Sequence, residues 1–279
     1  MAKLKYVNSD NKSIELGNSS PFLITTVDGL GSPKNEVYTQ KSPYQDGVTA
    51  THSSLGPRNI VIEGKIMDSN RENRQAYRNK LLSVFNPKLD GKLIIDLGNV
   101  KRQIDCIVEQ APYFSSKAER NYQDFSINLI APNPYWQDIN TTQKEIVTWI
   151  GGISFPLQLP TQFATAGPKI INIINSGDVE TPIRLEVTGT ATNPKILKRL
   201  TGEFIKVNRT LATDDTLVIT TDFGNKRVEQ NGVNVFNYID LNSTFFSLDV
   251  GDNVIELITD DVTDNANIKI SYRNRYLGV

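Results

Sequence analysis

The chain has very few of the residues that most often carry chemistry in proteins. Among 279 residues it contains one cysteine, Cys106, and one histidine, His52. One thiol excludes an internal disulfide, and one imidazole with one thiol cannot supply the ligands of a usual zinc site. We therefore expect no metal site. We interpret Cys106 as a small core residue of a strand and His52 as a turn or loop residue.

Patterns that mark enzymes are also missing. The sequence has no Gly-x-x-x-x-Gly-Lys-Ser/Thr loop, no Gly-x-Gly-x-x-Gly turn and no Gly-x-Ser-x-Gly elbow. Asp260, Asp261 and Asp264 cluster in "TDDVTDN" but lack the spacing of a calcium-binding loop, which favours a solvated turn. We expect no catalytic residues and no cofactor. The paired carboxylates of a hydrolase depend on separation in space, so that class stays open.

Strong charge imbalance and long apolar runs are absent as well. Thirty basic residues face 31 acidic ones, and the net charge of −1 gives no general attraction to nucleic acid or to an anionic membrane. No apolar run reaches the length of a membrane span, and "MAKLKYVNSD" has no apolar signal core. We expect a soluble protein that is made in the cytoplasm and not exported, with no nucleic-acid partner and no membrane insertion.

Alternating apolar and polar residues fill most of the N-terminal half. "RNIVIEGKI" places Ile60 and Ile62 on one side, and "DFSINLI" does the same with Phe125, Ile127 and Leu129. This period of two predicts half-buried antiparallel strands, and the turn residues between such stretches predict hairpins. The sequence is therefore typical of a mainly β fold.

One stretch, "MDSNRENRQAYRNKLLSVFNPKLDG", follows the period of a helix instead. Ser69 followed by Glu72 predicts a capping box at its start, and the residue before Pro87 closes it. The predicted helix spans residues 70–85. Its apolar stripe consists of Tyr77, Leu81, Val84 and Phe85. Because one helix cannot form a core alone, this stripe must pack on a sheet or on another subunit.

Prolines and glycines interrupt the chain between "APNPYWQD" and "AGPKIINIINSG", which predicts an extended arm and a domain junction near Asp138. The expected division is an N-terminal β domain over residues 1–138 and, over 139–279, a linker arm followed by a second β domain. Many short strands in the second domain indicate a β-sandwich or jelly roll. We interpret its aromatic residues as core; they include Phe204, Phe236, Phe245 and Tyr272.

Taken in order, several stretches resemble the phage distal tail protein family, a siphophage tail component. They include "PYQDGVTATHSSLGPRNIVIEGKI", "LLSVFNPKLDGKLIIDL", "RQIDCIVEQAPYF", "FSINLIAPNPYWQD", "NSGDVETPIRLEVTGTATNPKI", "LDVGDNVIEL" and "YRNRYLG". The resemblance implies an antiparallel N-terminal β domain with one α-helix that assembles into a hexameric ring. It also implies a galectin-like C-terminal β-sandwich outside the ring.

The resemblance further implies a structural role at the virion tail tip of a phage or prophage particle. The hub would join the tail tube protein to tail-fibre or lysin proteins and, in some phages, to a receptor-binding protein. Within the predicted helix and its end, the candidate subunit-interface residues are Arg71, Arg74, Arg78, Asn86 and Pro87. A carbohydrate-binding adhesion module is the alternative, and it requires exposed aromatic residues on the C-terminal sandwich.

Overall fold

The computed structural model describes residues 3–116, 121–146, 149–151, 164–166, 169–261 and 263–279. The chain forms two compact units. Unit 1 contains Met1–Ile139 together with Tyr276–Val279, and unit 2 contains Asn140–Arg275. Unit 2 is therefore an insertion near the end of unit 1, and the chain passes between the two units twice. The last four residues, predicted to belong to the C-terminal domain, return to unit 1.

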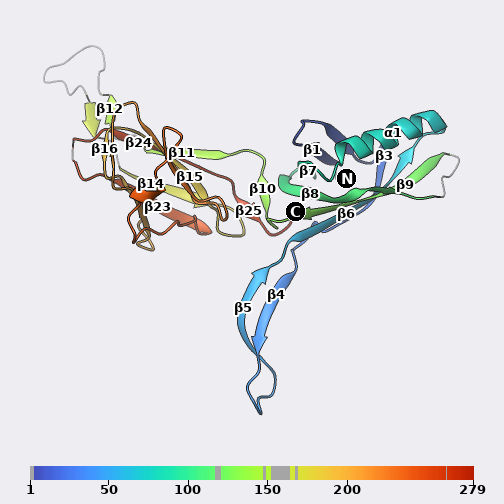
Figure 1. Ribbon diagram of the computed structural model, residues 1–279, viewed down its shortest axis with the longest axis horizontal. Coiled ribbons are helices and arrows are strands. Elements are labelled where there is room, and N and C mark those ends of the chain that lie inside the picture. The colour runs from blue at the N-terminus through green and yellow to red at the C-terminus, as the bar shows by residue number, and fades with distance from the viewer. Residues whose placement is uncertain (1–2, 117–120, 147–148, 152–163, 167–168, 262) are drawn as a thin grey trace. The chain divides into compact units, whose positions relative to one another are not determined.

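Unit 1 is built on one antiparallel sheet with the strand order β2-β1-β7-β8-β9-β6-β3 (Figure 1). The bounds are β1 Lys3–Asn8, β2 Ser13–Leu16, β3 Phe22–Asp28, β6 Arg58–Met67, β7 Asp90–Asp96, β8 Lys101–Phe114 and β9 Tyr122–Ala131. Two short strands, β10 Trp136–Asp138 and β25 Arg275–Tyr276, pair with each other, and β10 also pairs with β8. The predicted antiparallel β domain is confirmed.

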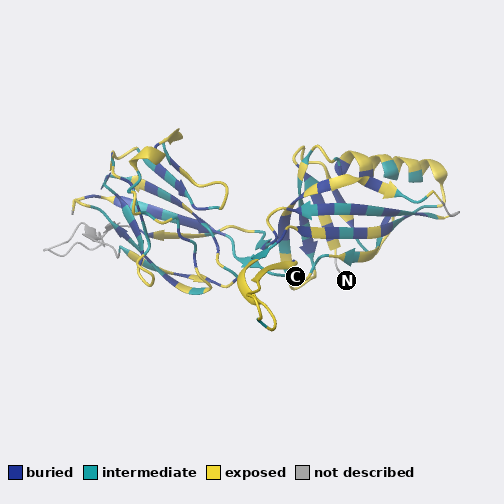
Figure 2. Ribbon diagram, turned by 60° about the horizontal axis from the view of Figure 1, so that its bottom comes forward, coloured by how far each residue is buried: buried dark blue, intermediate teal, exposed yellow. Residues whose placement is uncertain are grey.

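The alternation seen in the sequence becomes a one-sided core. In β6 every second residue is buried, and its partner β9 repeats the pattern in register over ten residue pairs. Ile60 lies opposite Leu129 and Ile62 opposite Ile127, as a period of two requires. Figure 2 shows the result as alternating buried and exposed bands along these strands. Cys106 lies in this core, and burial raises the pKa of its thiol to about 12.

The single α-helix of the described residues, α1 Arg71–Val84, covers the apolar face of this sheet. Leu81, Val84 and Phe85 are buried, and Tyr77 packs on the edge of Phe22 with ring centres 5.6 Å apart. The predicted stripe is confirmed. The predicted capping box at Ser69 is wrong: the N-cap is Asn70, whose side-chain oxygen accepts a hydrogen bond from the Glu72 amide at 2.8 Å.

Unit 2 is a β-sandwich. One sheet has the order β11-β24-β15-β20-β21-β22, and the other has the order β14-β23-β17-β18. Their bounds are β11 Thr142–Ile146, β14 Ile170–Asn175, β15 Ile183–Gly189, β17 Lys195–Lys198, β18 Phe204–Lys206, β20 Thr216–Thr220, β21 Arg227–Gln230, β22 Val233–Asn234, β23 Gly251–Ile258 and β24 Ala266–Tyr272. Residues of both sheets share one apolar core, which confirms the predicted sandwich.

Smaller elements complete the chain. They are β12 Trp149–Gly151 paired with β13 Ala164–Ala166, β16 Ala191–Thr192 paired with β19 Thr210–Leu211, and a 3-10 helix at Phe236–Tyr238. Much of the stretch expected to be an extended linker arm lies outside the described residues. Within the described part, β11 is not an arm, because it pairs with β24 over five residues.

Candidate assembly surface

The most unusual feature of unit 1 is a β-hairpin that leaves the sheet. Strand β4, Asn35–Gln40, pairs with β5, Thr49–Leu55, and the two are inserted between β3 and β6 (Figure 1). We call residues 35–55 the arm. Every residue of β4 is exposed, as are the first five residues of β5. At about 3.3 Å per residue, six paired residues extend about 20 Å. Figure 2 shows the arm as an exposed ribbon.

The arm presents apolar and aromatic groups to its surroundings. Val37 and Tyr38 lie on β4, and Tyr44 and Val48 lie near the tip; all four side chains are more than half exposed. Tyr38 stacks on His52 across the hairpin with ring centres 5.9 Å apart. His52 is therefore a strand residue and not the turn or loop residue that was expected. An isolated two-stranded hairpin is marginally stable in water, so such an arm gains by being covered.

The base of the arm is fixed by close backbone packing. Gly29, which follows β3, has a φ of +87°, and a Cβ there would lie 2.1 Å from the Asn59 carbonyl oxygen. Only glycine fits this approach. Where the two arm strands meet the sheet, the amide of Gly56, which follows β5, donates to the carbonyl of Lys34, which precedes β4, at 3.0 Å. The chain thus leaves and re-enters the sheet through a defined junction.

Arg58, the first residue of β6, lies beneath that junction and is 2% exposed. Its Nε donates to the Pro134 carbonyl at 2.8 Å, and its Nη1 donates to the Gly29 carbonyl at 2.8 Å and also to Gly31. Its Nη2 donates to the Leu277 carbonyl at 2.7 Å. Burial lowers the pKa of the guanidinium, and these carbonyls replace the water it has lost.

The predicted interface residues on α1 do not form one surface row. Arg74 donates to the Asp68 carbonyl, and Arg78 lies over the Phe114 ring at 4.6 Å, so both side chains turn toward their own unit. Arg71 is exposed. At the helix end, the Asn86 side chain accepts from the Lys88 amide at 3.0 Å, and Pro87 is exposed in the same turn.

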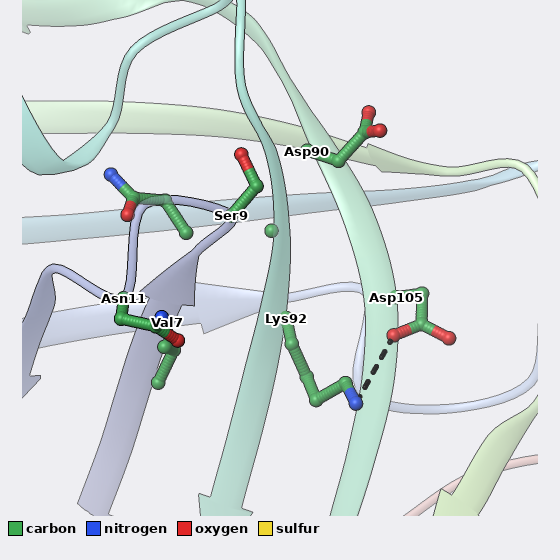
Figure 3. Close-up of a pocket in the computed structure, with 8 residues that line it drawn as sticks. Val7, Ser9, Asn11, Asp90, Lys92 and Asp105 are labelled. Carbon is green, nitrogen blue, oxygen red and sulfur yellow. Dashed lines mark ion pairs between the residues drawn. The ribbon is translucent and has the colours of Figure 1, made fainter.

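A hollow of about 370 Å³ lies beside the β1–β2 turn, and Figure 3 shows the residues that line it. Lys92 and Asp105 form an ion pair across its wall at 3.7 Å, and Asn8, Asn11 and Asp90 also line it. The hollow is shallow, and its lining contains neither histidine nor cysteine. It has no arrangement recognisable as a nucleophile with a base.

The acidic cluster of unit 2 is occupied by its own neighbours. Asp264 accepts from the Thr192 amide at 2.6 Å, Asp260 accepts from Asn193 at 2.8 Å, and Asp261 accepts from the Thr263 amide at 2.8 Å. These hydrogen bonds lower the pKa of Asp260 and Asp261. Across the described residues, no group of three or more histidine, cysteine or acidic side chains is placed to share a metal ion.

Aromatic residues of unit 2 are less buried than the sequence analysis assumed. Tyr272 is in the core, but Phe236 and Tyr238 are each about two-fifths exposed, and Phe223 is 95% exposed. Phe236 stacks on Phe245 at 5.6 Å, and the Arg209 guanidinium lies 4.7 Å from the centre of the Tyr238 ring. The prediction that Phe236 belongs to the core is therefore wrong.

None of the helices in the described residues combines the length and apolarity needed to cross a membrane.

Comparison with known families agrees with this architecture. The profile of the phage tail protein RIFT-related domain matches residues 9–131, and that of the siphovirus-type tail component, C-terminal domain, matches residues 176–276. The chain belongs to the phage distal tail protein family. It is thus a structural tail component, and the two matched regions fall in unit 1 and unit 2, respectively.

Solved structures of tail proteins share the fold. The chain matches the crystal structure of phage SPP1 Dit, described as a paradigm of the hub adsorption apparatus of phages that infect Gram-positive bacteria. That match has a TM-score of 0.72 at 13% identity and covers 98% of both chains. It also matches a chain of the activated phage P2 baseplate with Ca, with a TM-score of 0.54 at 12% identity over the full length of both chains. No curated protein sequence matches the chain.

The sequence did not reveal the β4–β5 arm, residues 35–55. Its strands read "NEVYTQ" and "TATHSSL", which are rich in β-branched and polar residues but lack the apolar alternation of a packed strand. The available signal was Pro33 and Pro57 on either side of two stretches with strand formers, and Gly47 between them; in the structure Gly47 has a φ of +79°. Strands without a buried face show no such alternation, so a search for alternating apolar residues does not find them.

Proposed function

We propose that six copies of this chain form a closed ring that serves as the hub at the distal end of a phage tail. Unit 1 makes the ring, and unit 2 is an interaction or spacer module outside it. The ring joins the tail tube protein to the tail-tip or baseplate proteins, including tail-fibre or lysin proteins and a receptor-binding protein. Family membership and the likeness to a hub protein support this placement.

The observation that carries the ring proposal is the uncovered arm. A closed ring forms when one patch of a subunit meets a different patch on the next copy. The arm supplies a projecting patch with exposed Val37 and Tyr38, which its own unit leaves open. A neighbouring copy of the same chain is the partner present at highest local concentration in a hub, so we assign the arm to it.

The second patch in this proposal contains the predicted residues around α1. Arg71 is exposed, while Asn86 and Pro87 form the turn that leads into β7. Arg74 and Arg78 contribute their aliphatic stems and fix the edge of the helix through Asp68 and Phe114. The near-zero net charge puts little repulsion between identical copies.

The proposal includes no enzymatic activity. Membership in a structural family and the occupied state of the acidic cluster support this reading. The expected result is that purified protein does not hydrolyse glycans or peptidoglycan. Hydrolysis that a single Asp or Glu substitution abolished would contradict it.

We also propose that residues 1–138 and 139–279 are separate domains, with the last few residues returning to the first. Limited proteolysis is expected to cut first between residues 138 and 168, part of which lies outside the described residues. Early cuts within β9 or β15 would count against this division.

Solution mass tests the ring. Six times the chain mass of 31.2 kDa is about 187 kDa, and two stacked rings would give twice that. Native mass spectrometry and light scattering are expected to show one of these values. The double variant Val37→Asp/Tyr38→Asp should shift the mass to a single chain without changing thermal unfolding of unit 1. Leu200→Asp, at an equally exposed apolar site in unit 2, is the matched control and should leave the ring intact. A stable dimer or trimer would contradict six-fold assembly.

The alternative, a carbohydrate-binding adhesion module, is favoured only by the exposure of Phe223, Phe236 and Tyr238. Sugar stacking needs an open ring face, and both Phe236 and Tyr238 have a face partly used by a neighbouring side chain. A glycan array probed with the full chain and with Phe223→Ala separates the two functions. Specific binding lost in that variant would support the adhesion module.

A further inference from the structure

Arg58 is an uncommon kind of buried cation. A buried charge normally pairs with a carboxylate, yet all four hydrogen bonds of Arg58 go to main-chain carbonyls. Hydrogen bonds to charged groups stabilise more than those between neutral groups. The position of a carbonyl is set by the path of the backbone. The hydrogen bonds of this guanidinium therefore all form only while each contributing segment keeps its conformation.

Those carbonyls come from three segments that are far apart in the sequence. Gly29 and Gly31 form the base of the arm, Pro134 precedes β10, and Leu277 follows β25. The last two segments lie beside the points where the chain enters and leaves unit 2. Arg58 thus binds the base of the arm to both connections with the inserted unit.

A second arginine holds the same C-terminal segment from another strand. Arg102 on β8 lies 3.5 Å from the centre of the Tyr276 ring, and its Nη1 donates to the Gly278 carbonyl. Arg102 and Arg58 therefore share residues 276–279 as a common partner. The Val279 amide also donates to the Leu30 carbonyl at 3.2 Å, next to the base of the arm.

We propose that Arg58 is a positioning residue that couples the C-terminal segment to the arm, so that displacement of residues 276–279 releases the base of the arm. While the segment is docked, the four carbonyls hold Gly29 and Gly31 and aim the arm. When it is displaced, the guanidinium loses the Leu277 carbonyl and the arm base loses its bond from Val279. The effect of this coupling on ring assembly rests on the proposed function. The coupling itself acts within one chain and does not depend on that function.

The decisive variant is Arg102→Met in the full chain, because Arg102 holds the C-terminal segment and belongs to neither the arm nor its base. Lys92→Met is the matched control. It removes a cation from the neighbouring strand, and that cation pairs with Asp105 instead of with the C-terminal segment. Hydrogen exchange is followed by mass spectrometry at the amides of residues 29–34 and of Gly56, with β9 as the internal reference. Native mass spectrometry of the same samples ensures that states of equal mass are compared.

Arg102→Met is expected to speed exchange at the arm base by about tenfold, the equivalent of one charge-assisted hydrogen bond, and to leave β9 unchanged. Lys92→Met is expected to change neither. Arg58→Lys, which keeps the charge but not the planar fork of donors, should reproduce the effect of Arg102→Met. Unchanged exchange at the arm base in Arg102→Met would overturn the coupling.

The assembly readout separates this inference from the proposed function. If both hold, the concentration at which Arg102→Met assembles rises about tenfold. Faster exchange with unaltered assembly would retain the coupling and remove the arm from the ring interface. A wild-type chain that never exceeds the mass of a dimer would contradict the ring and leave the exchange result to decide the coupling alone.

Discussion

Two hairpins of unit 1 follow opposite rules although both are antiparallel and of similar length. In the β7–β8 hairpin, Leu93 lies opposite Ile104, and Ile95 and Cys106 are buried on the same side of the sheet. In the arm, six residue pairs form with one register shift between Tyr38 and Thr39, and no residue of β4 is buried. Both hairpins therefore have paired backbones. They differ in side-chain burial, which distinguishes a strand of the core from a strand that projects out of the unit.

The comparison is tested most strongly by truncating one apolar side chain on each hairpin. Leu93→Ala removes a fully buried side chain and is expected to lower the free energy of unfolding of unit 1 by about 2–5 kcal/mol. Val37→Ala on the arm is expected to change it by less than about 0.5 kcal/mol in the dilute chain. Urea unfolding followed by Trp136 fluorescence in a Trp149→Phe background measures both values. Similar costs at the two sites would erase the distinction.

A smaller effect is expected where the helix that covers the sheet begins. Asn70→Ala removes the side-chain acceptor for the Glu72 amide and should cost about 0.5–2 kcal/mol. Ser69→Ala is the matched control and should cost less than about 0.5 kcal/mol, because Ser69 is exposed and is not the cap. The same unfolding experiment reports both. A larger loss at Ser69 would restore the capping box that the sequence predicted.

The smallest effect concerns pH and again separates the two hairpins. Burial raises the pKa of Cys106 to about 12 from an ordinary value near 9, so the folded state keeps its proton where the unfolded chain loses it. Stability from this group is complete below about pH 9 and falls as the pH rises toward 12. Burial also raises the pKa of Tyr6 on the adjoining strand, which adds a fall in the same direction.

Unfolding measured from pH 8 to 11 checks this dependence. The wild-type free energy of unfolding should decrease with pH, and Cys106→Ala should decrease less steeply. His52→Ala on the arm is the control and should retain the wild-type slope. A Cys106→Ala slope equal to that of the wild type would show that this thiol is not shielded in the folded chain.

The spacing of apolar residues within one strand or helix predicted which face of that element is buried. The period of two in "RNIVIEGKI" and the stripe of Leu81, Val84 and Phe85 each report a face turned to the core, and the structure confirms both. The cap was misplaced by one residue because Ser69 and Asn70 are both good cap formers, and only the backbone path selects one.

The rest depends on contacts that no local pattern encodes. Arg58 in "GPRNIVIEG" reads as an exposed strand end, and its burial follows from carbonyls up to 219 residues away. The return of residues 276–279 to unit 1 has the same origin. Of the candidate site, the helix arginines remain a prediction, and the arm was not found because an uncovered strand lacks the alternation used to recognise strands.

The insertion of unit 2 also sets an order of events during synthesis. Leu277 and Gly278 leave the ribosome only after all of unit 2 has been translated, since Asn140–Arg275 precedes them in the chain. A nascent chain can therefore form the sheet of unit 1 and complete unit 2 while Arg58 still lacks one acceptor and Arg102 lacks its own. Nascent chains in one polysome therefore hold incompletely supported arms until Leu277 and Gly278 of each copy have emerged.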